Sequence, residues 1–98
     1  MAYNFIVSIE AELETISATD YYDNKSVSLG TKFLADLNAS YSKLITNPQY
    51  YKYIARNRKA GLRCIKLKKF PFLVVYHVHM DNITIVSVLN THRKSKFG

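Results

Sequence analysis

The sequence contains a single cysteine, no tryptophan and no apolar run long enough to cross a bilayer. Cys64 alone excludes an internal disulfide framework and fits a reducing compartment. A membrane-spanning helix needs about 20 apolar residues, and the short apolar run near the N-terminus has no basic segment before it. Neither a membrane partner nor a signal peptide is therefore indicated. A chain of 98 residues can form one modest core, so we expect a single domain over residues 1–98, located in the cytoplasm.

Acidic residues are scarce in one part of the chain, and none occurs from Lys52 to Met80. Residues 1–40 hold two lysines against six acids, a balance of −4, whereas residues 41–98 hold twelve lysines and arginines against Asp81, a balance of +11. Charge separated in this way produces a focused positive field, which suits a polyanion or an acidic protein partner. A basic surface kept only for solubility is the simpler alternative, although solubility does not require the signs to be separated.

The first half of the chain predicts one strand and two helices. The segment YNFIVSI over residues 3–9 has the length and composition of a short strand. Ser8 is a suitable N-cap for a helix over residues 10–25, whose first turn carries acids that favour the helix dipole. A second helix within residues 28–48 ends at Pro48, because proline disfavours helix in the residue before it. The first helix carries a moderately apolar stripe of Leu13, Ile16 and Asp20 or Tyr21. The second carries a clearer one of Phe33, Leu37, Tyr41, Leu44 and Ile45.

The second half changes from a helical period to an alternating one. Strands are predicted over residues 51–57 and 62–70, on either side of a glycine turn, and over residues 72–80 and 82–90, on either side of a tight turn. Two helices on one face of a small antiparallel sheet make an α+β domain of order β-α-α-β-β-β.

Alternation also assigns side chains to the two faces of this sheet. In one strand Lys66 falls on the face opposite Arg63, and in the next strand His77 and His79 fall opposite Tyr76. Half of each strand is apolar enough to meet the helices. The remainder offers a face or rim with cations and a few rings, which is a surface for something negative.

Several short motifs occur in a fixed order. They are Leu29-Gly30 opening the second helix, Asn47-Pro48 closing it, Arg63 seven residues before Phe70-Pro71, Tyr76 in the next strand, and the ending LNTHRK. This order, over about residues 5–96, resembles the RelE/ParE superfamily, the toxins of bacterial type II toxin–antitoxin modules, and its ParE-like branch in particular. The resemblance implies a compact α+β fold and a cognate antitoxin protein that wraps the toxin. The antitoxin is expected to present acidic residues to the surface around Arg63, Lys66, Lys68 and Arg93.

Two toxic mechanisms occur in this superfamily, so the resemblance leaves the target open. RelE-like members cut mRNA in the ribosomal A site without a metal, whereas ParE-like members poison DNA gyrase and are not known as nucleases. We expect metal-independent, ribosome-dependent mRNA cleavage first, with non-enzymatic inhibition of DNA gyrase as the alternative and an inactive, regulatory relative as the third. Many relatives place a histidine where this chain has Asn90. His92 follows two positions later, on the same strand face if the strand continues.

Cleavage of RNA by its own 2′-hydroxyl needs a proton acceptor, a proton donor and fixed positive charge at the phosphorane. His92 is the candidate for proton transfer, because histidine titrates near neutral pH. Arg63 and Arg93 suit bidentate phosphate contact. Tyr76 could stack on a base or donate its hydroxyl, or it could be a half-buried core residue. Looser attraction of the nucleic-acid backbone is expected from Lys66, Lys68, Lys69, Lys94 and Lys96.

His77 and His79 share a strand face and could hold a transition metal. Two ligands without a third are a weak signal, and Asp81, the one carboxylate of the basic half, suits its turn. We therefore expect no metal and no cofactor. Two interpretations are open for Tyr50, Tyr51 and Tyr53: they stack on bases, or they pack over the end of the second helix. Packing is preferred. A solvated face is the simplest interpretation of Glu10, Glu12 and Glu14.

Overall fold

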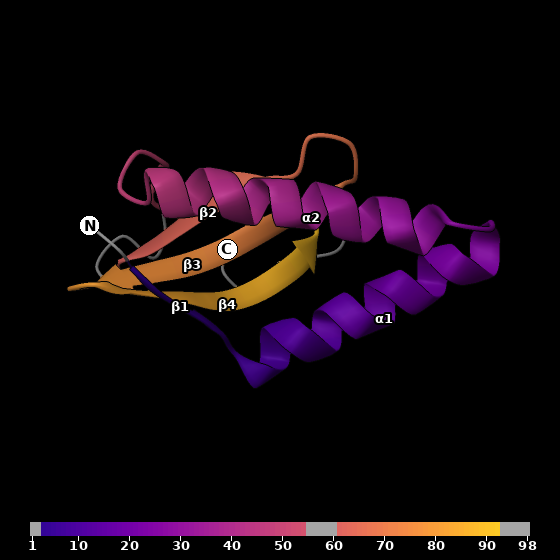
Figure 1. The fold of residues 1–98 in the computed structure, drawn as a ribbon, viewed down its shortest axis with the longest axis horizontal. Helices are drawn as coiled ribbons and strands as arrows, with labels where there is room; N and C mark the ends of the chain where they lie inside the picture. Colours follow the sequence, from indigo (N-terminus) through magenta and orange to yellow (C-terminus); the bar gives the residue numbers. More distant parts are fainter. Residues whose placement is uncertain (1–2, 55–60, 93–98) are drawn as a thin grey trace.

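The structure is a computed structural model that describes residues 3–54 and 61–92. Its elements follow the predicted order β-α-α-β-β-β. They are β1 (Asn4–Val7), α1 (Ile9–Lys25), α2 (Leu29–Thr46), β2 (Leu62–Lys66), β3 (Phe72–His79) and β4 (Asn82–Asn90). The helices form a hairpin beside the sheet, and they diverge from the end where they are joined (Figure 1).

The sheet is mixed, with the strand order β1-β4-β3-β2. Adjacent pairs among β2, β3 and β4 are antiparallel, which confirms the expected pairing of the C-terminal strands. β1 departs from an antiparallel sheet because it pairs in parallel with β4, with Asn4 opposite Asn82 and Val7 opposite Ile85. Alternation indicates which side chains face the core, but it carries no information on the direction of a four-residue edge strand.

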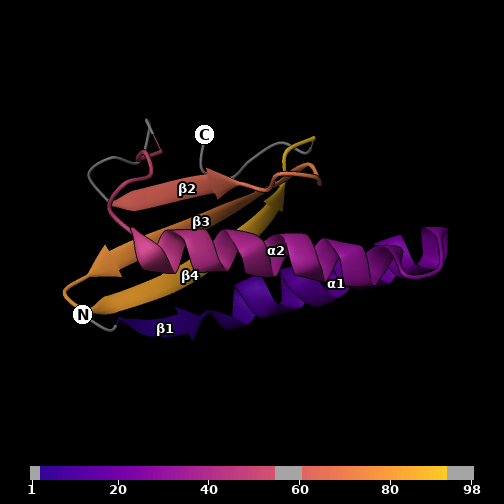
Figure 2. The same ribbon diagram turned by 45° about the horizontal axis from the view of Figure 1, so that its top comes forward.

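The core lies between the helices and one face of the sheet. Tyr76 and Val74 of β3 and Ile83 and Ile85 of β4 are buried with Phe33 of α2. α2 lies along this face and α1 beside it (Figure 2). The apolar stripe predicted on the second helix therefore forms the helical half of the core, with the exception of Ile45, which is exposed.

Local signals place the helix ends where they were expected. The Ser8 hydroxyl accepts a bond of 3.1 Å from the N–H of Ala11, so Ser8 is the N-cap of α1. α2 ends at Thr46, ahead of Pro48. Gly30 opens α2 against the Asp23 carboxylate, which accepts a bond of 3.0 Å from the Gly30 N–H. A β-carbon at Gly30 would collide with that carboxylate, so the contact explains the glycine of the Leu-Gly motif.

The largest differences from the predicted strands lie on either side of the glycine turn. Within residues 51–54, the structure has an isolated bridge from Tyr53 to Arg63 instead of a strand, and residues 55–57 lie outside the described part. The strand predicted over 62–70 ends at Lys66. A tight turn follows, in which the Phe72 N–H donates to the Phe70 carbonyl at 2.8 Å.

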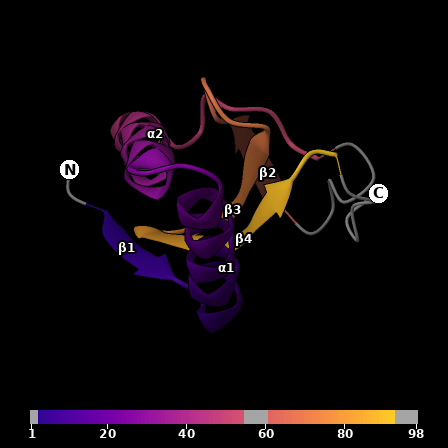
Figure 3. The same ribbon diagram turned by 90° about the vertical axis from the view of Figure 1, so that its right-hand side faces the viewer.

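The apolar stripe predicted on the first helix faces solvent. Leu13 is 61% exposed and Ile16 is 57% exposed. α1 instead buries the small side chains of Ala11 and Ala18, which allow its backbone to lie close to β4 and α2. Figure 3, which looks along the helices, shows α1 in front of β4 with α2 beside it. Within residues 3–54 and 61–92, neither helix is long and apolar enough to cross a membrane.

Two helix carboxylates bind the sheet and its connections. Glu14 of α1 accepts bonds of 2.7 Å from the Ser87 hydroxyl and 2.9 Å from the Val88 N–H, which corrects its assignment to a solvated face. Asp36 of α2 is 6% exposed and lies beside the turn between β2 and β3. Such charge-assisted bonds are stronger than neutral ones, so both carboxylates stabilise the contact between helix and sheet.

Candidate functional site

Arg63 lies on β2 directly opposite Tyr76 of β3, on the face of the sheet that meets the helices. Its Nη1 donates to the carbonyl oxygens of Gln49 at 3.1 Å and Tyr51 at 2.7 Å, and its Nη2 donates to the Tyr53 hydroxyl at 2.8 Å. The guanidinium carbon also lies 4.0 Å from the centre of the Tyr53 ring, which is cation–π geometry. Arg63 therefore holds the segment that leaves α2, whereas the sequence indicated a group directed at phosphate.

Tyr76 supports the same segment from inside the core. Its side chain has no exposed surface, and its hydroxyl donates to the Pro48 carbonyl at 2.7 Å. Burial raises the pKa of this hydroxyl, while the nearby Arg63 charge acts in the opposite direction. A ring without exposed surface cannot stack on a base. Of the two alternatives for Tyr76, base contact or a core position, the structure therefore agrees with the core position. We call Pro48–Tyr53, with the two side chains that bind it, the exit clamp.

The tyrosines of the exit clamp have different surroundings. Tyr51 is half-buried and packs against the core, as packing over the helix end requires. Tyr53 contacts Arg63, and Tyr50 is 73% exposed with its ring 5.1 Å from that of Tyr51. The preferred packing role therefore applies to Tyr51 and not to Tyr50.

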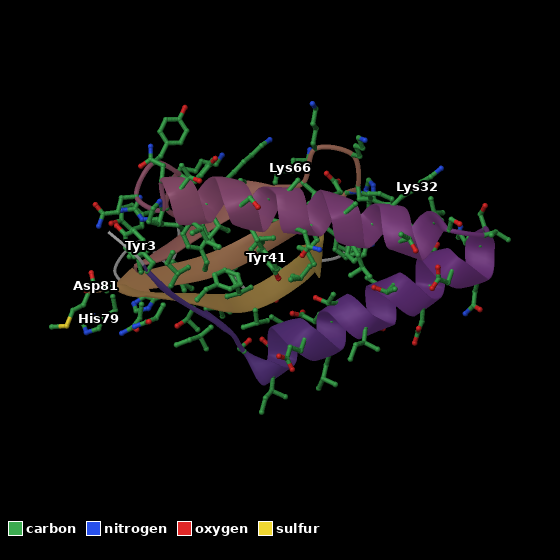
Figure 4. All side chains as sticks on the ribbon, viewed as in Figure 1. Tyr3, Lys32, Tyr41, Lys66, His79 and Asp81 are labelled. Atoms are coloured by element: carbon green, nitrogen blue, oxygen red, sulfur yellow. The ribbon has the colours of Figure 1, made fainter. Side chains whose placement is uncertain are left out.

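Three of the predicted nucleic-acid-binding lysines lie where β2 ends and the next turn begins, in a segment that we call the basic turn (Lys66–Lys69). The side chains of Lys66, Lys68 and Lys69 are exposed, whereas Leu67 between them is buried. In Figure 4 the side chains of Lys66 and Lys32 both point away from the ribbon, on the side of α2 remote from α1. The turn thus presents separate cations to solvent, which suits attraction of a polyanion.

His92 lies just beyond β4, which ends at Asn90, so the strand does not carry His92 on its face. The His92 side chain is exposed, and its main-chain N–H donates to Asn90 Oδ1 at 2.8 Å. The preceding Thr91 donates to the Pro71 carbonyl from its N–H at 2.8 Å and from its hydroxyl at 3.1 Å. These bonds place the His92 turn against the chain that follows the basic turn, and Figures 1 and 2 show both at the same end of the sheet. Outside the described residues lie Arg93, Lys94 and Lys96.

His77 and His79 lie on the face of β3 opposite Tyr76, as alternation predicted. Their rings are stacked, with centres 6.1 Å apart and planes 10° apart. Among residues 3–54 and 61–92, no group of three histidine, cysteine or carboxylate side chains could hold a metal ion. These two histidines also lie toward the opposite end of β3 from Phe72, which pairs with Asn90 near His92.

The predicted site residues that the structure describes therefore separate into two groups. Arg63 and Tyr76 are brought together in the exit clamp, whereas the basic turn and His92 lie at the same end of the sheet, joined through the bonds of Thr91 to Pro71. Sequence reasoning did not assign a role to Asp36, which binds the basic turn. A signal for it was present, because an aspartate next to Phe33 and Leu37 on the buried stripe of a helix requires a polar partner.

The arrangement of two helices beside a four-stranded sheet defines the class of fold. No protein-family model matches the sequence, and no curated protein matches it significantly. The fold, in contrast, is similar to that of a solved chain described as "Chromosomal ParDE TA system from P. aeruginosa", with a TM-score of 0.73 and 16% sequence identity. The match covers 90% of this chain and 95% of that chain. It confirms the RelE/ParE-like fold that the motifs predicted.

Proposed function

We propose that this protein is the toxin of a toxin–antitoxin pair and that, when free in the cytoplasm, it inhibits growth by cleaving mRNA on the ribosome without a metal. The fold shared with a chain of a ParDE system supports the toxin assignment. The observation that carries the mechanism is that Thr91, the neighbour of His92, is bonded to Pro71, which follows the basic turn, so that both segments lie at one end of the sheet.

The proposed chemistry uses the RNA's own 2′-hydroxyl as the nucleophile. The O2′–P bond forms, the P–O5′ bond breaks, and the products are a 2′,3′-cyclic phosphate and a 5′-hydroxyl. The 2′-hydroxyl loses a proton and the leaving 5′-oxygen gains one; His92 carries out one of these two transfers and water the other, while Lys68 and Lys69 attract the phosphate. Arg93 remains a proposed phosphate contact, and Lys94 and Lys96 proposed backbone contacts, from the motif alone. In this proposal Arg63 and Tyr76 support the fold and do not touch RNA.

An antitoxin would have two different surfaces to cover. One is the basic turn, which suits acidic residues. The other is the exposed apolar stripe of α1, where Ile9 is 77% exposed beside Leu13 and Ile16. A groove of about 280 Å³ between the helices adjoins this stripe and is lined by Ile16 and Tyr41, and Figure 4 shows Tyr41 between the two helices. Exposed apolar surface of this kind is typical of protein interfaces, which supports a protein partner.

Inhibition of DNA gyrase is the second candidate, and a specific observation favours it. The guanidinium of Arg63 is engaged and Tyr76 is buried, which removes two of the four side chains expected in a nuclease site. A protein that acts by binding a target needs no catalytic groups. The name of the similar structure, a ParDE system, is in accord with this alternative.

Controlled expression distinguishes the two candidates. Protein synthesis and DNA synthesis are followed separately after induction, and mRNA ends are mapped by primer extension. Loss of protein synthesis with new mRNA ends supports cleavage. DNA damage that appears while translation continues would contradict mRNA cleavage and support gyrase inhibition. No effect on growth in either assay contradicts the toxin assignment itself.

A further inference from the structure

Asp36 joins α2 to the basic turn. Its Oδ2 accepts bonds of 2.8 Å from the N–H of Lys69 and 3.0 Å from the N–H of Phe70. The carboxylate comes from a residue that is 6% exposed, so its position is set by the packing of α2. Two main-chain donors that converge on one buried oxygen determine the path of the turn on which Lys68 and Lys69 stand.

The same turn is joined to the segment of His92. The Pro71 carbonyl accepts from both donors of Thr91, at 2.8 Å and 3.1 Å, and Asn90 Oδ1 accepts from the His92 N–H at 2.8 Å. Hydrogen bonds therefore join the turn to Asp36 at Lys69 and Phe70, and the next residue, Pro71, to Thr91 beside His92. They set the main-chain position of the turn relative to the segment that carries His92.

We propose that Lys68, Lys69 and His92 form a binding site for a phosphodiester of single-stranded RNA, and that Asp36 is the residue that positions it. The inference rests on the proposed function and assigns the substrate contact of the same site. Two ammonium groups attract the phosphate, and the exposed imidazole on the adjoining segment is the group assigned to exchange a proton with the RNA. In this proposal Asp36 does not contact the RNA. It acts by holding the turn that carries Lys68 and Lys69.

Position and charge predict opposite effects for Asp36. Its negative charge, taken alone, weakens phosphate binding, so a purely electrostatic role predicts tighter binding when it is removed. A positioning role predicts weaker binding when the turn is released. Asp36→Asn separates the two, because its amide oxygen accepts from the same N–H groups without the charge.

Glu14 provides a matched control. It forms the equivalent pair of bonds from α1, at 2.7 Å and 2.9 Å, but to Ser87 and Val88 of β4. Glu14→Ala and Asp36→Ala therefore each remove one carboxylate with two bonds from a contact between helix and sheet. If RNA binding falls because the protein is less stable, both variants should bind RNA more weakly. If it falls because the turn has moved, only Asp36→Ala should.

The experiment measures binding of a fluorescent single-stranded RNA of roughly 12 nucleotides to the purified full chain, by anisotropy at two salt concentrations. We expect Asp36→Ala to weaken binding at least about tenfold, since displacement of a site by about 1 Å has large effects. Asp36→Asn and Glu14→Ala should stay within about threefold of the wild type. Asp36→Glu, which keeps the charge but moves it by one methylene, should weaken binding and provides the test if Asp36→Ala does not fold.

Equal losses in Asp36→Ala and Glu14→Ala would overturn the positioning role, as would unchanged or tighter binding in Asp36→Ala or Asp36→Glu. A wild-type protein that cleaves mRNA on ribosomes but retains RNA binding in Lys68→Ala/Lys69→Ala contradicts the site alone. A wild-type protein that neither binds nor cleaves RNA and inhibits gyrase contradicts the proposed function, and the site with it.

Discussion

Replacement of Arg63 by alanine should destabilise the protein by about 3 kcal/mol, whereas an exposed arginine outside a network changes stability by about 0.5 kcal/mol or less. The partly buried bond to the Tyr51 carbonyl, at 2.7 Å, accounts for about 1.5 kcal/mol as a bond from a charged donor. The remainder comes from two exposed bonds and the contact with the Tyr53 ring at 4.0 Å, each of which contributes about 0.5 kcal/mol.

Urea unfolding, followed by circular dichroism, measures this change. Arg63→Lys serves as the comparison, because lysine retains the charge but lacks the planar fork that reaches three acceptors. It should recover less than half of the loss. Amide exchange adds a local measurement, since the Ile54 N–H, which donates to the Leu62 carbonyl at 2.8 Å, should exchange faster when the exit clamp is released.

A different result would refute the reasoning. If Arg63→Ala unfolds within about 0.5 kcal/mol of the wild type and still loses growth inhibition, Arg63 faces the target and the exit clamp is incidental. If instead the loss of stability is large and Lys66→Ala, an exposed neighbour on β2, has no effect on stability, the structural role holds.

Three further predictions concern other parts of the fold. Gly30→Ala should cost about 1–2 kcal/mol in urea unfolding despite the helix preference of alanine, because the new β-carbon displaces the Asp23 carboxylate; a gain in stability would contradict the contact. Burial raises the pKa of Tyr41 to about 12, so on raising the pH the unfolded chain loses this phenol proton first, near pH 10. The contribution of Tyr41 to stability should therefore be constant below pH 10 and fall from pH 10 to 12. A urea midpoint that rises over this interval would contradict the shift. Leu13→Ser and Ile16→Ser should change the free energy of unfolding by less than about 0.5 kcal/mol, because both side chains are exposed. The same variants should retain less of the adjacent gene's product, the expected antitoxin, in a pull-down. A loss of stability of several kcal/mol would mean that the stripe is buried inside the protein.

Elements with several apolar residues in register were predictable from the sequence. The stripe through Phe33, Leu37 and Leu44 defined α2, and the alternation around Val74 and Ile83 defined β3 and β4. Such patterns repeat a single preference many times, so one exception does not change the result. The motif order added the fold that the solved structure confirms.

The site was less predictable, because its side chains bind groups that lie far away in the sequence. Two of the three acceptors of Arg63 are main-chain oxygens that precede it by 12 and 14 residues, and every residue type carries such an oxygen. Glu14 looked like one more acid on a solvated helix, but its partners lie 73 and 74 residues later. On α1 the larger side chain of Leu13 suggested the buried face, whereas close approach favours the alanines.

The pairing of the first strand with the last strand affects how the chain is made. In the described part of the chain, β1 forms its hydrogen-bonded ladder with β4. Asn4 lies opposite Asn82, which is 78 positions later. At synthesis rates of about 5–20 residues per second, the N-terminal strand waits several seconds for the partner that completes its ladder. A chain that stops within β3 lacks this partner altogether. The full sheet, and any activity that depends on it, therefore arises only after β4 has been made.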